Sequence, residues 1–226
     1  MARSTADDPR HAFSERTGVS RETLDRLDLY AALLEKWQRR INLIGPKTVP
    51  ELWRRHMADS AQLASHLPPD ARRLADFGSG GGFPGLVLAA MGAERGLEHV
   101  TLVEADQRKA AFLREAARSM GLSDRVTVRA ERLESLQGLA VDLVTARALA
   151  SVSDLLSYVQ VACGAHTPCL FLKGKRLQDE LTDAKSAWYI KYRIAPSSTD
   201  PEGAILIIED FADVRTDSGV HDAPQG

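Results

Sequence analysis

The chain contains 226 residues, of which 44% are hydrophobic and 27% charged, a composition typical of one ordinary globular domain with an added segment. This composition excludes a fully disordered chain, a collagen-like fibre and a small disulfide-built protein, and no apolar run is long enough for a membrane helix. The net charge is −2, but residues 196–226 contain seven Asp or Glu and a single Arg, so the rest of the chain is slightly basic. A nucleic-acid partner therefore requires a local basic patch.

Two features of the sequence bear on the cellular compartment. Residues 1–8 contain no apolar stretch, so they are not a secretory signal. Cys163 and Cys169 fit neither a zinc-ligand spacing nor a redox pair. We therefore expect a cytoplasmic protein, with no membrane and no metal ion among its partners.

The first third of the chain has a helical pattern. Residues 1–20 are polar, and we expect them to be loosely ordered. From Ser20, apolar residues recur at spacings of three and four, which predicts a helix. A second helical region is predicted over residues 48–67, where a Pro-Pro-Asp sequence ends it. Together these segments predict a helical extension over residues 1–70.

Strands and helices alternate in the next part of the chain, which predicts a parallel, doubly wound sheet. Strands are expected at 73–77, 99–104, 125–130, 141–147, 169–173, 189–194 and 204–209, and helices at 86–91, 107–120, 152–161 and 177–188. The last two strands are too close in sequence for a crossover helix, so they should pair antiparallel. We expect an α/β fold over residues 71–212, with a mostly parallel seven-stranded sheet and a C-terminal antiparallel hairpin. This is the Rossmann-like fold of S-adenosylmethionine-dependent methyltransferases. Residues 213–226 are expected to form an acidic, disordered tail.

A glycine-rich string, Asp76-Phe-Gly78-Ser-Gly80-Gly-Gly82, connects the first strand of this sheet to the next helix. Four glycines in five positions exceed what a turn needs, and glycine lets the backbone approach a ligand closely. Residues 80–85 also fit the dinucleotide pattern G-x-G-x-x-G, which alone is a weak signal. The carboxylate of Asp76 suits a ligand with an ammonium and a sulfonium and would repel a pyrophosphate. The loop therefore favours S-adenosylmethionine over NAD, with Asp76, Gly78 and Gly80 at the cofactor.

Three further strand ends supply candidate cofactor contacts, because ligands of such sheets bind at the carboxyl ends of the strands. Glu104 ends the second strand, where an acid can accept hydrogen bonds from both ribose hydroxyls. Ala130 and Glu131 end the third strand, and we expect them against the adenine. Arg147 ends the fourth strand, where a long cation needs a partner or a cavity, so we expect it to face the cofactor or the substrate.

The sequence resembles the RsmG (GidB) family of 16S rRNA guanine-N7 methyltransferases, from about Leu29 to Glu209. The resemblance rests on strings that occur in the order found in that family: Asn42-Leu-Ile, Arg55-His-Met-Ala-Asp-Ser60, Asp76-Phe-Gly-Ser-Gly-Gly-Gly-Phe-Pro-Gly-Leu86, Glu104-Ala-Asp-Gln-Arg-Lys-Ala-Ala-Phe-Leu113, Arg147-Ala-Leu-Ala-Ser151 and Leu172-Lys-Gly174. The glycine string alone indicates a methyltransferase, whereas the strings before and after it are specific to the family. The three consecutive glycines at 80–82 are a departure, since members often carry a larger residue in the middle.

This resemblance implies methyl transfer from S-adenosylmethionine to N7 of a guanine in the 530 loop of 16S rRNA, with the small ribosomal subunit as partner. It places cofactor contacts on five residues, with Glu104 as the acid for the ribose. The five are Gly78, Phe83, Ala130, Glu131 and Arg147. The adenine contacts are defined only within residues 129–134. We expect the protein to be a monomer.

The implied chemistry agrees with what the sequence lacks. Guanine N7 already has an in-plane lone pair, so the enzyme has to align two reactants and needs no catalytic base. Amino-group methyltransferases of this fold carry an Asp/Asn-Pro-Pro-aromatic sequence after the fourth strand, whereas this chain has residues 146–149, Ala-Arg-Ala-Leu. Pro168-Cys169 resembles the nucleophile of C5-pyrimidine enzymes, but it begins an apolar strand, so we expect Cys169 to be a small buried residue.

The RNA must be bound by cations, and two groups are available. The candidates are Arg39, Arg40, Arg54, Arg55 and His56 in the extension and Lys173, Lys175 and Arg176 after the fifth strand. Of these, Lys173, Arg54 and His56 are our candidate substrate contacts. His56, Asp59 and Ser60 share one helical face, and they fit a buried cluster that docks the extension equally well.

Three other functions stay open at this point. An NAD-dependent oxidoreductase would use residues 80–85, although the chain has no Tyr-x-x-x-Lys sequence for it. A non-catalytic rRNA-binding or assembly factor could keep the same fold. Methylation of a small molecule is the third.

Overall fold

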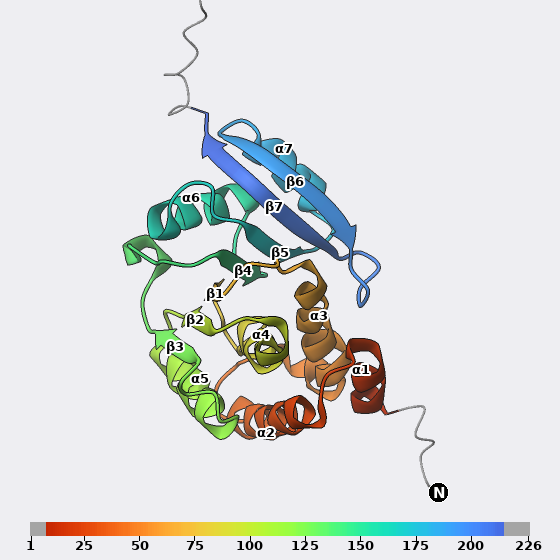
Figure 1. Ribbon diagram of the computed structural model, residues 1–226. Helices are drawn as coiled ribbons and strands as arrows, with labels where there is room; N and C mark the ends of the chain where they lie inside the picture. Colours follow the sequence, from red (N-terminus) through yellow and green to blue (C-terminus); the bar gives the residue numbers. More distant parts are fainter. Residues whose placement is uncertain (1–7, 215–226) are drawn as a thin grey trace, which may run out of the picture.

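A seven-stranded sheet forms the centre of the molecule (Figure 1), in the order β3-β2-β1-β4-β5-β7-β6. The computed structural model describes residues 8–214, without the side chain of Ala93. Strands β1 to β5 pair in parallel, and β7 runs antiparallel to both β5 and β6. The expected fold, a mostly parallel seven-stranded sheet that ends in an antiparallel hairpin, is confirmed.

The elements follow the predicted order along the chain. The strands are β1 Arg73–Phe77, β2 His99–Val103, β3 Val126–Arg129, β4 Leu143–Arg147, β5 Cys169–Lys173, β6 Trp188–Pro196 and β7 Ala204–Asp213. The α-helices are α1 Pro9–Thr17, α2 Arg21–Gln38, α3 Ala58–Ala61, α4 Gly85–Gly92, α5 Gln107–Ser119, α6 Val152–Cys163 and α7 Leu177–Ala184. Short 3-10 segments lie at Pro46–Glu51, Gln62–His66, Ala93–Arg95 and Leu133–Ser135, and a π-helical turn lies at Trp53–Met57.

Successive residues of the central strands point to opposite faces of the sheet and fill two cores. In β1, Leu74 packs into the core beneath α4 and α5, while Ala75 and Phe77 pack into the core beneath α6 and α7. All three side chains are fully buried. The strand is buried on both faces because helices cover the parallel sheet on both sides.

The extension lies on the α4 and α5 side of the sheet, and its long helix α2 contacts both of these helices. The ring of Tyr30 lies 5.3 Å from that of Phe83 and 6.3 Å from that of Phe112, measured between centroids. The ring of Trp37 lies 5.8 Å from that of Phe112. The buried hydroxyl of Tyr30 donates a hydrogen bond to the carbonyl of Gly81. The extension thus shares its core with the sheet and contacts the glycine string.

The expectation that residues 1–20 are loosely ordered is wrong for helix α1. Asp8 caps this helix by accepting a hydrogen bond from a backbone N–H, and Gly18 ends it with a φ of 61°. Phe13 is the buried residue of the helix, and its ring packs edge-on against Trp53 at 5.3 Å. A single aromatic anchor stabilises the helix without producing an apolar stripe, so periodicity did not detect it.

The second helical region is present over the predicted range, but it is not one α-helix. Two 3-10 segments, a π-helical turn and one turn of α-helix follow each other from Pro46 to His66. Pro50 lies inside the first segment, and its missing N–H prevents a regular α-helical hydrogen bond there.

The loop between β6 and β7, residues 197–203, is attached to the extension by side-chain hydrogen bonds. The carboxylate of Asp59 accepts a hydrogen bond from the hydroxyl of Thr199 at 2.7 Å. The amide oxygen of Gln62 accepts one from the backbone N–H of Ser198 at 2.9 Å. The C-terminal hairpin is thereby fixed against α3 and the segment that follows it.

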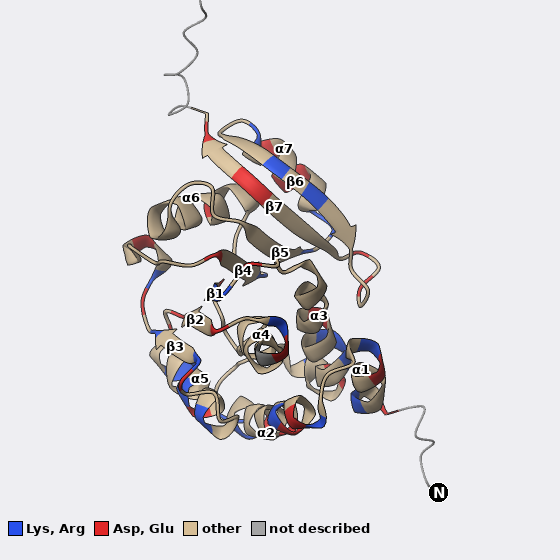
Figure 2. Ribbon diagram, in the orientation of Figure 1, with Lys and Arg blue, Asp and Glu red and all other residues tan. Residues whose placement is uncertain are grey.

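The hairpin itself carries paired charges on its exposed surface, seen as adjacent blue and red segments of β6 and β7 in Figure 2. Lys191 on β6 forms an ion pair with Glu209 on β7 at 3.1 Å. The expected acidic tail at 213–226 lies, apart from its first two residues, outside the described residues. Within residues 8–214, no helix is long and apolar enough to span a membrane.

Candidate functional site

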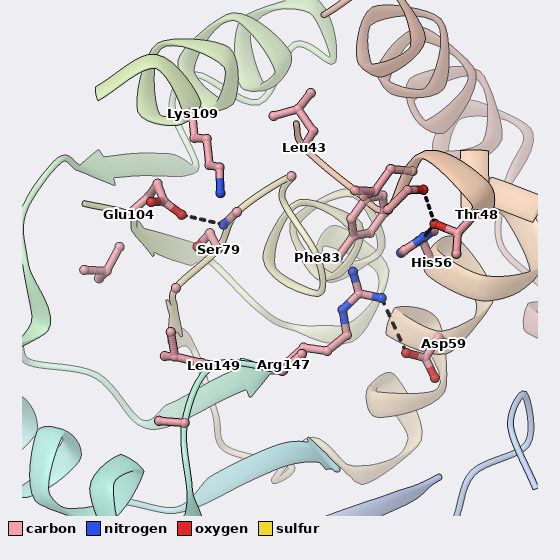
Figure 3. A pocket seen from close by; sticks show the side chains of 18 of the residues that line it. Leu43, Thr48, His56, Asp59, Ser79, Phe83, Glu104, Lys109, Arg147 and Leu149 are labelled. Atoms are coloured by element: carbon pink, nitrogen blue, oxygen red, sulfur yellow. Dashed lines mark hydrogen bonds and ion pairs between the residues drawn. The ribbon is translucent and has the colours of Figure 1, made fainter. Parts of the chain in front are cut away.

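A cavity of about 790 Å³ lies at the carboxyl ends of β1, β2 and β4 (Figure 3). We call it the main cavity. Four segments of the chain line it: the glycine string, the ends of β2 and β3, the end of β4, and the extension. The glycine string contributes residues 78–81 and 83, and the part of the chain around the ends of β2 and β3 contributes 103–105, 109 and 131–134. The part after β4 contributes 147–150 and 158, and the extension contributes 43–45, 48, 54–56 and 59. Residues 199–201 of the hairpin loop lie at the rim.

The glycine string turns sharply beneath this cavity. Gly78, Gly80 and Gly82 have φ values of 64°, 55° and 93°, a region that other residues rarely adopt. A Cβ on Gly78 would lie 2.5 Å from a methyl of Leu149, and one on Gly82 would lie 2.7 Å from the Tyr30 hydroxyl. The glycines therefore provide both the backbone turn and the space that the neighbouring side chains occupy.

Glu104 holds the glycine string against β2. One carboxylate oxygen accepts a hydrogen bond from the N–H of Gly80 at 2.8 Å, and the other accepts one from the N–H of Asp106 at 2.8 Å. The residue is 9% exposed and lines the main cavity. Each oxygen retains a lone pair, so the carboxylate can also accept hydrogen bonds from a diol in the cavity.

Asp76 does not reach the main cavity, in contrast to the expectation that it contacts the cofactor. It is fully buried behind the loop. Its oxygens accept hydrogen bonds from the hydroxyl of Thr145 at 2.8 Å and from the N–H of Gly85 at 3.2 Å. Burial raises the pKa of this carboxyl to about 6 despite those hydrogen bonds. Asp76 therefore joins β1, β4 and the start of α4, and so it positions the loop.

We predict that Asp76→Asn removes a pH-dependent loss of stability. Between the ordinary pKa of 3.8 and about 6, the unfolded chain releases a proton that the folded chain keeps. The wild-type protein therefore loses stability as the pH rises through this range, by up to about 3 kcal/mol. Asn can still accept from Gly85, so the variant should be about 1–3 kcal/mol more stable at pH 7.

Urea unfolding of the wild type and Asp76→Asn between pH 3.5 and 8 measures this effect. Asp142→Asn is the control, because the pKa of Asp142 is shifted in the opposite direction. Desolvation raises that pKa, but hydrogen bonds from Arg72 and Arg73 outweigh it and lower the pKa. An Asp76→Asn variant with the same pH dependence as the wild type would show that Asp76 is not the group responsible.

The third strand end matches the prediction only in part. Glu131 lines the main cavity and forms an ion pair with Arg129 at 2.6 Å. Ala130 is not among the lining residues, and its carbonyl accepts a hydrogen bond from the side chain of Gln107 at 3.3 Å. The lining continues instead through the next three residues, of which Leu133 supplies an apolar surface.

Arg147 lies in the main cavity wall at the end of β4, beside the extension (Figure 3). Its side chain is 19% exposed, and its guanidinium lies 5.0 Å from the centre of the Phe83 ring. Asp59 provides a carboxylate oxygen at 3.5 Å. Burial lowers the pKa of Arg147, while the Asp59 charge opposes that shift. A guanidinium that is mostly shielded from solvent and has one carboxylate at 3.5 Å is suited to binding an anionic group.

His56 belongs to the π-helical turn of the extension, and its ring packs against that of Phe83. Its ring centroid is 5.1 Å from that of Phe83, and its Nε2 is 2.7 Å from the hydroxyl of Thr48. Burial, reinforced by the charges of Arg147 and Arg55, lowers the pKa of His56 to about 4. His56 is therefore neutral at physiological pH.

The other two candidate substrate contacts lie apart from each other. Arg54 is an exposed residue at the mouth of the main cavity and forms an ion pair with Glu51. Lys173 lies in a neighbouring hollow of about 540 Å³, which we call the side hollow. The ammonium of Lys173 donates to the carbonyl of Ala150 at 2.7 Å and to Glu180 at 2.6 Å. Lys173 thus supports the turn that separates the two hollows.

A sequence model of the family described as GidB, rRNA small subunit methyltransferase G, matches residues 23–200. The chain belongs to this family. Two curated relatives named Ribosomal RNA small subunit methyltransferase G come from Paramagnetospirillum magneticum and Parvibaculum lavamentivorans. They are 53% and 52% identical to this chain over 197 residues. The matches cover 87% and 86% of this chain and 93% and 86% of the relatives.

Solved structures agree at the level of the fold. A SAM-dependent O-methyltransferase from Thermotoga maritima has a TM-score of 0.52 and 17% identity, over 79% of this chain and 71% of its own. The ribosomal protein L11 methylase from Lactobacillus delbrueckii subsp. bulgaricus has a TM-score of 0.53 and 16% identity, over 67% of this chain and 76% of its own.

In this GidB-family chain, several cavity residues were not among the predicted contacts. They are Leu43, Ile44, Thr48, Lys109, Leu133 and Leu149. Leu43, Ile44, Lys109 and Leu149 fall inside strings that carry the family resemblance, so those strings held a signal for the site. Thr48 and Leu133 lie in short 3-10 segments, and the place of these segments beside the cavity depends on the tertiary fold.

Proposed function

We propose that this protein transfers a methyl group from S-adenosylmethionine to N7 of a guanine in the 530 loop of 16S rRNA, in the small ribosomal subunit of the cytoplasm. The observation that carries the proposal is the family match over residues 23–200, which includes every segment of the main cavity up to its rim. Family membership also argues against the NAD-dependent alternative.

The residues of the main cavity fit the proposed cofactor. Glu104 can accept hydrogen bonds from the ribose hydroxyls, and the apolar side chain of Leu133 with Glu131 can flank the adenine. Gly78 and Gly80 leave room for the ligand above the loop, because neither carries a Cβ. Phe83 and Arg147 form the far wall. When bound, S-adenosylmethionine supplies an electrophilic methyl group on a sulfonium.

Methylation of N7 needs no catalytic base, which agrees with the hydrogen bonds and ion pairs that the acidic side chains of the wall already make. The N7 lone pair forms the new N–C bond while the S–C bond breaks, so no proton leaves the guanine and no base is needed. Glu104 is bound to two backbone N–H groups, Glu131 to Arg129, and Asp59 to Arg147 and Thr199. The chain's task is therefore to hold the two reactants in line, which can contribute about 7–11 kcal/mol in ideal cases.

Basic side chains of the protein that can bind the RNA lie on two sides of the site. Arg54 and Arg55 line the main cavity from the extension, and Lys175 and Arg176 line the side hollow after β5. Figure 2 shows Lys and Arg on the extension as well. All four side chains are exposed, as phosphate contacts require. The guanine would enter through the side hollow, which shares residues 147–150 with the main cavity.

The test uses labelled S-adenosylmethionine and 30S subunits from cells that lack this activity. Label in 16S rRNA, mapped by N7-methylguanine-specific chain cleavage to one guanine of the 530 loop, is the expected result. Naked 16S rRNA is tested in parallel, because it separates recognition of RNA from recognition of the assembled subunit.

Two other outcomes would contradict the proposal. Intact cofactor binding without label in RNA would direct the search to another methyl acceptor. Absence of both label and cofactor binding would favour the non-catalytic rRNA-binding factor.

A further inference from the structure

The turn that joins β4 to α6, residues 148–150, forms part of the walls of both the main cavity and the side hollow. Ala148 has a φ of 50°, a left-handed conformation that residues other than glycine rarely adopt. The next residue, Leu149, comes so close to Gly78 that a Cβ on this glycine would lie 2.5 Å from one of its methyls. A backbone conformation of this kind persists only where the surroundings hold it, so the turn needs a contact from outside.

Lys173, at the carboxyl end of β5, makes such a contact. Its ammonium donates to the carbonyl of Ala150 at 2.7 Å and to a carboxylate oxygen of Glu180, on α7, at 2.6 Å. The side chains of Lys173 and Glu180 are only 8% and 18% exposed. The turn is thereby tied to the strand next to β4 and to a helix that packs beside α6.

The burial of Lys173 argues against the role expected from the sequence, a contact with the RNA. Phosphate groups are bound by cations that reach the surface. Lys175 and Arg176, which follow in the chain, are exposed. In contrast, two of the three N–H groups of the Lys173 ammonium already donate to protein oxygens. The side chain is therefore committed to the turn.

We propose that Lys173 is a positioning residue for methyl transfer, which holds the turn at 148–150 in place through the carbonyl of Ala150. This role rests on the proposed function, which names the reaction. The turn follows Arg147 and separates the two hollows, so its position determines how a base in one faces a methyl group in the other. A displacement of about 1 Å between reactants can lower a rate about 100-fold. Glu180 orients the ammonium and compensates its charge.

Kinetics of a double variant test this role without leaving an unpaired charge. Lys173→Met alone removes the cation beside Glu180 and destabilises the protein, whereas Lys173→Met/Glu180→Met removes both charges and should keep the Tm within about 3 °C. Neither methionine donates to Ala150. We expect kcat on 16S rRNA to fall about tenfold or more, while the KM for the RNA stays within about twofold and the salt dependence of RNA binding is unchanged.

A second measurement follows the turn itself and needs no RNA. Backbone ¹⁵N relaxation gives an order parameter for each amide, about 0.85 in rigid segments and below about 0.6 in flexible ones. The amides of residues 148–150 should be rigid in the wild type and flexible in the double variant, while those of β4 and β5 stay rigid in both. Lys191→Met is the matched control, because Lys191 pairs with Glu209 on the surface of the hairpin and lines neither hollow. It should change neither kcat nor the order parameters.

Unchanged kcat in the double variant would overturn the proposal, and a raised KM for the RNA with a weaker salt dependence would make Lys173 a phosphate contact instead. Equal order parameters in the wild type and the double variant would also overturn it, because other contacts would then hold the turn. A wild-type protein that methylates no rRNA, with a turn that becomes flexible in the double variant, would refute only the proposed substrate and support the contact between Lys173 and the turn.

Discussion

Replacement of Gly78 by aspartate should abolish cofactor binding while the protein stays folded. The new side chain starts 2.5 Å from a methyl of Leu149 and adds a negative charge on the cavity side of the loop, near Glu104. We expect the affinity for S-adenosylhomocysteine to fall about 100-fold or more, equivalent to roughly 3 kcal/mol. Calorimetric titration measures the affinity, and thermal unfolding measures the stability.

Gly138→Asp is the matched control for this variant. Gly138 has a φ of 67°, close to the 64° of Gly78, but a Cβ there has no neighbour within 4 Å. Both variants therefore share the cost of a left-handed residue, about 1–2 kcal/mol, and only the variant at Gly78 enters the site. Unchanged affinity in Gly78→Asp would show that the cofactor does not lie over this loop.

Arg147→Ala should eliminate methyl transfer with little loss of stability. The substitution removes the cation that lies over Phe83 in the main cavity. Asp59 keeps hydrogen bonds from Thr199 at 2.7 Å and from Gln62 at 2.8 Å, so its charge is not left without a partner. We expect kcat/KM to fall about 100-fold or more, because an anion contact inside a partly buried site is worth a few kcal/mol.

Arg73→Ala provides the comparison for Arg147→Ala. Arg73 forms an ion pair with Asp142 at the same distance, 3.5 Å, but at the exposed amino end of β1. Its removal should change neither activity nor stability by more than about 1 kcal/mol. A collapse of the melting transition in Arg147→Ala would instead give Arg147 a structural role.

Local sequence patterns were sufficient for most of the fold. The alternation of apolar strands and amphipathic helices predicted the order of the elements, and the short gap before Ala204 predicted the antiparallel hairpin. Helix α1 was missed although Asp8, Pro9 and Gly18 form a normal start and stop signal. Those signals carry little weight without an apolar stripe, and α1 has one buried anchor, Phe13.

The candidate site was predicted less completely, and Asp76 shows why. A carboxylate at a strand end is compatible with a ligand contact and with a structural hydrogen bond, and the sequence does not distinguish them. The difference depends on Thr145 of β4, which reaches Asp76 only because β1 and β4 are neighbours.

The attachment of the hairpin loop to the extension bears on how the protein is made. Gln62 and Ser198, which hydrogen-bond to each other, are 136 positions apart in the chain. A nascent chain that has emerged only as far as β5 contains the glycine string, Glu104 and Arg147, but not the loop that binds Gln62 and Asp59. The rim of the main cavity can therefore close only after translation has reached the last hairpin, and a growing chain holds an unfinished site until then.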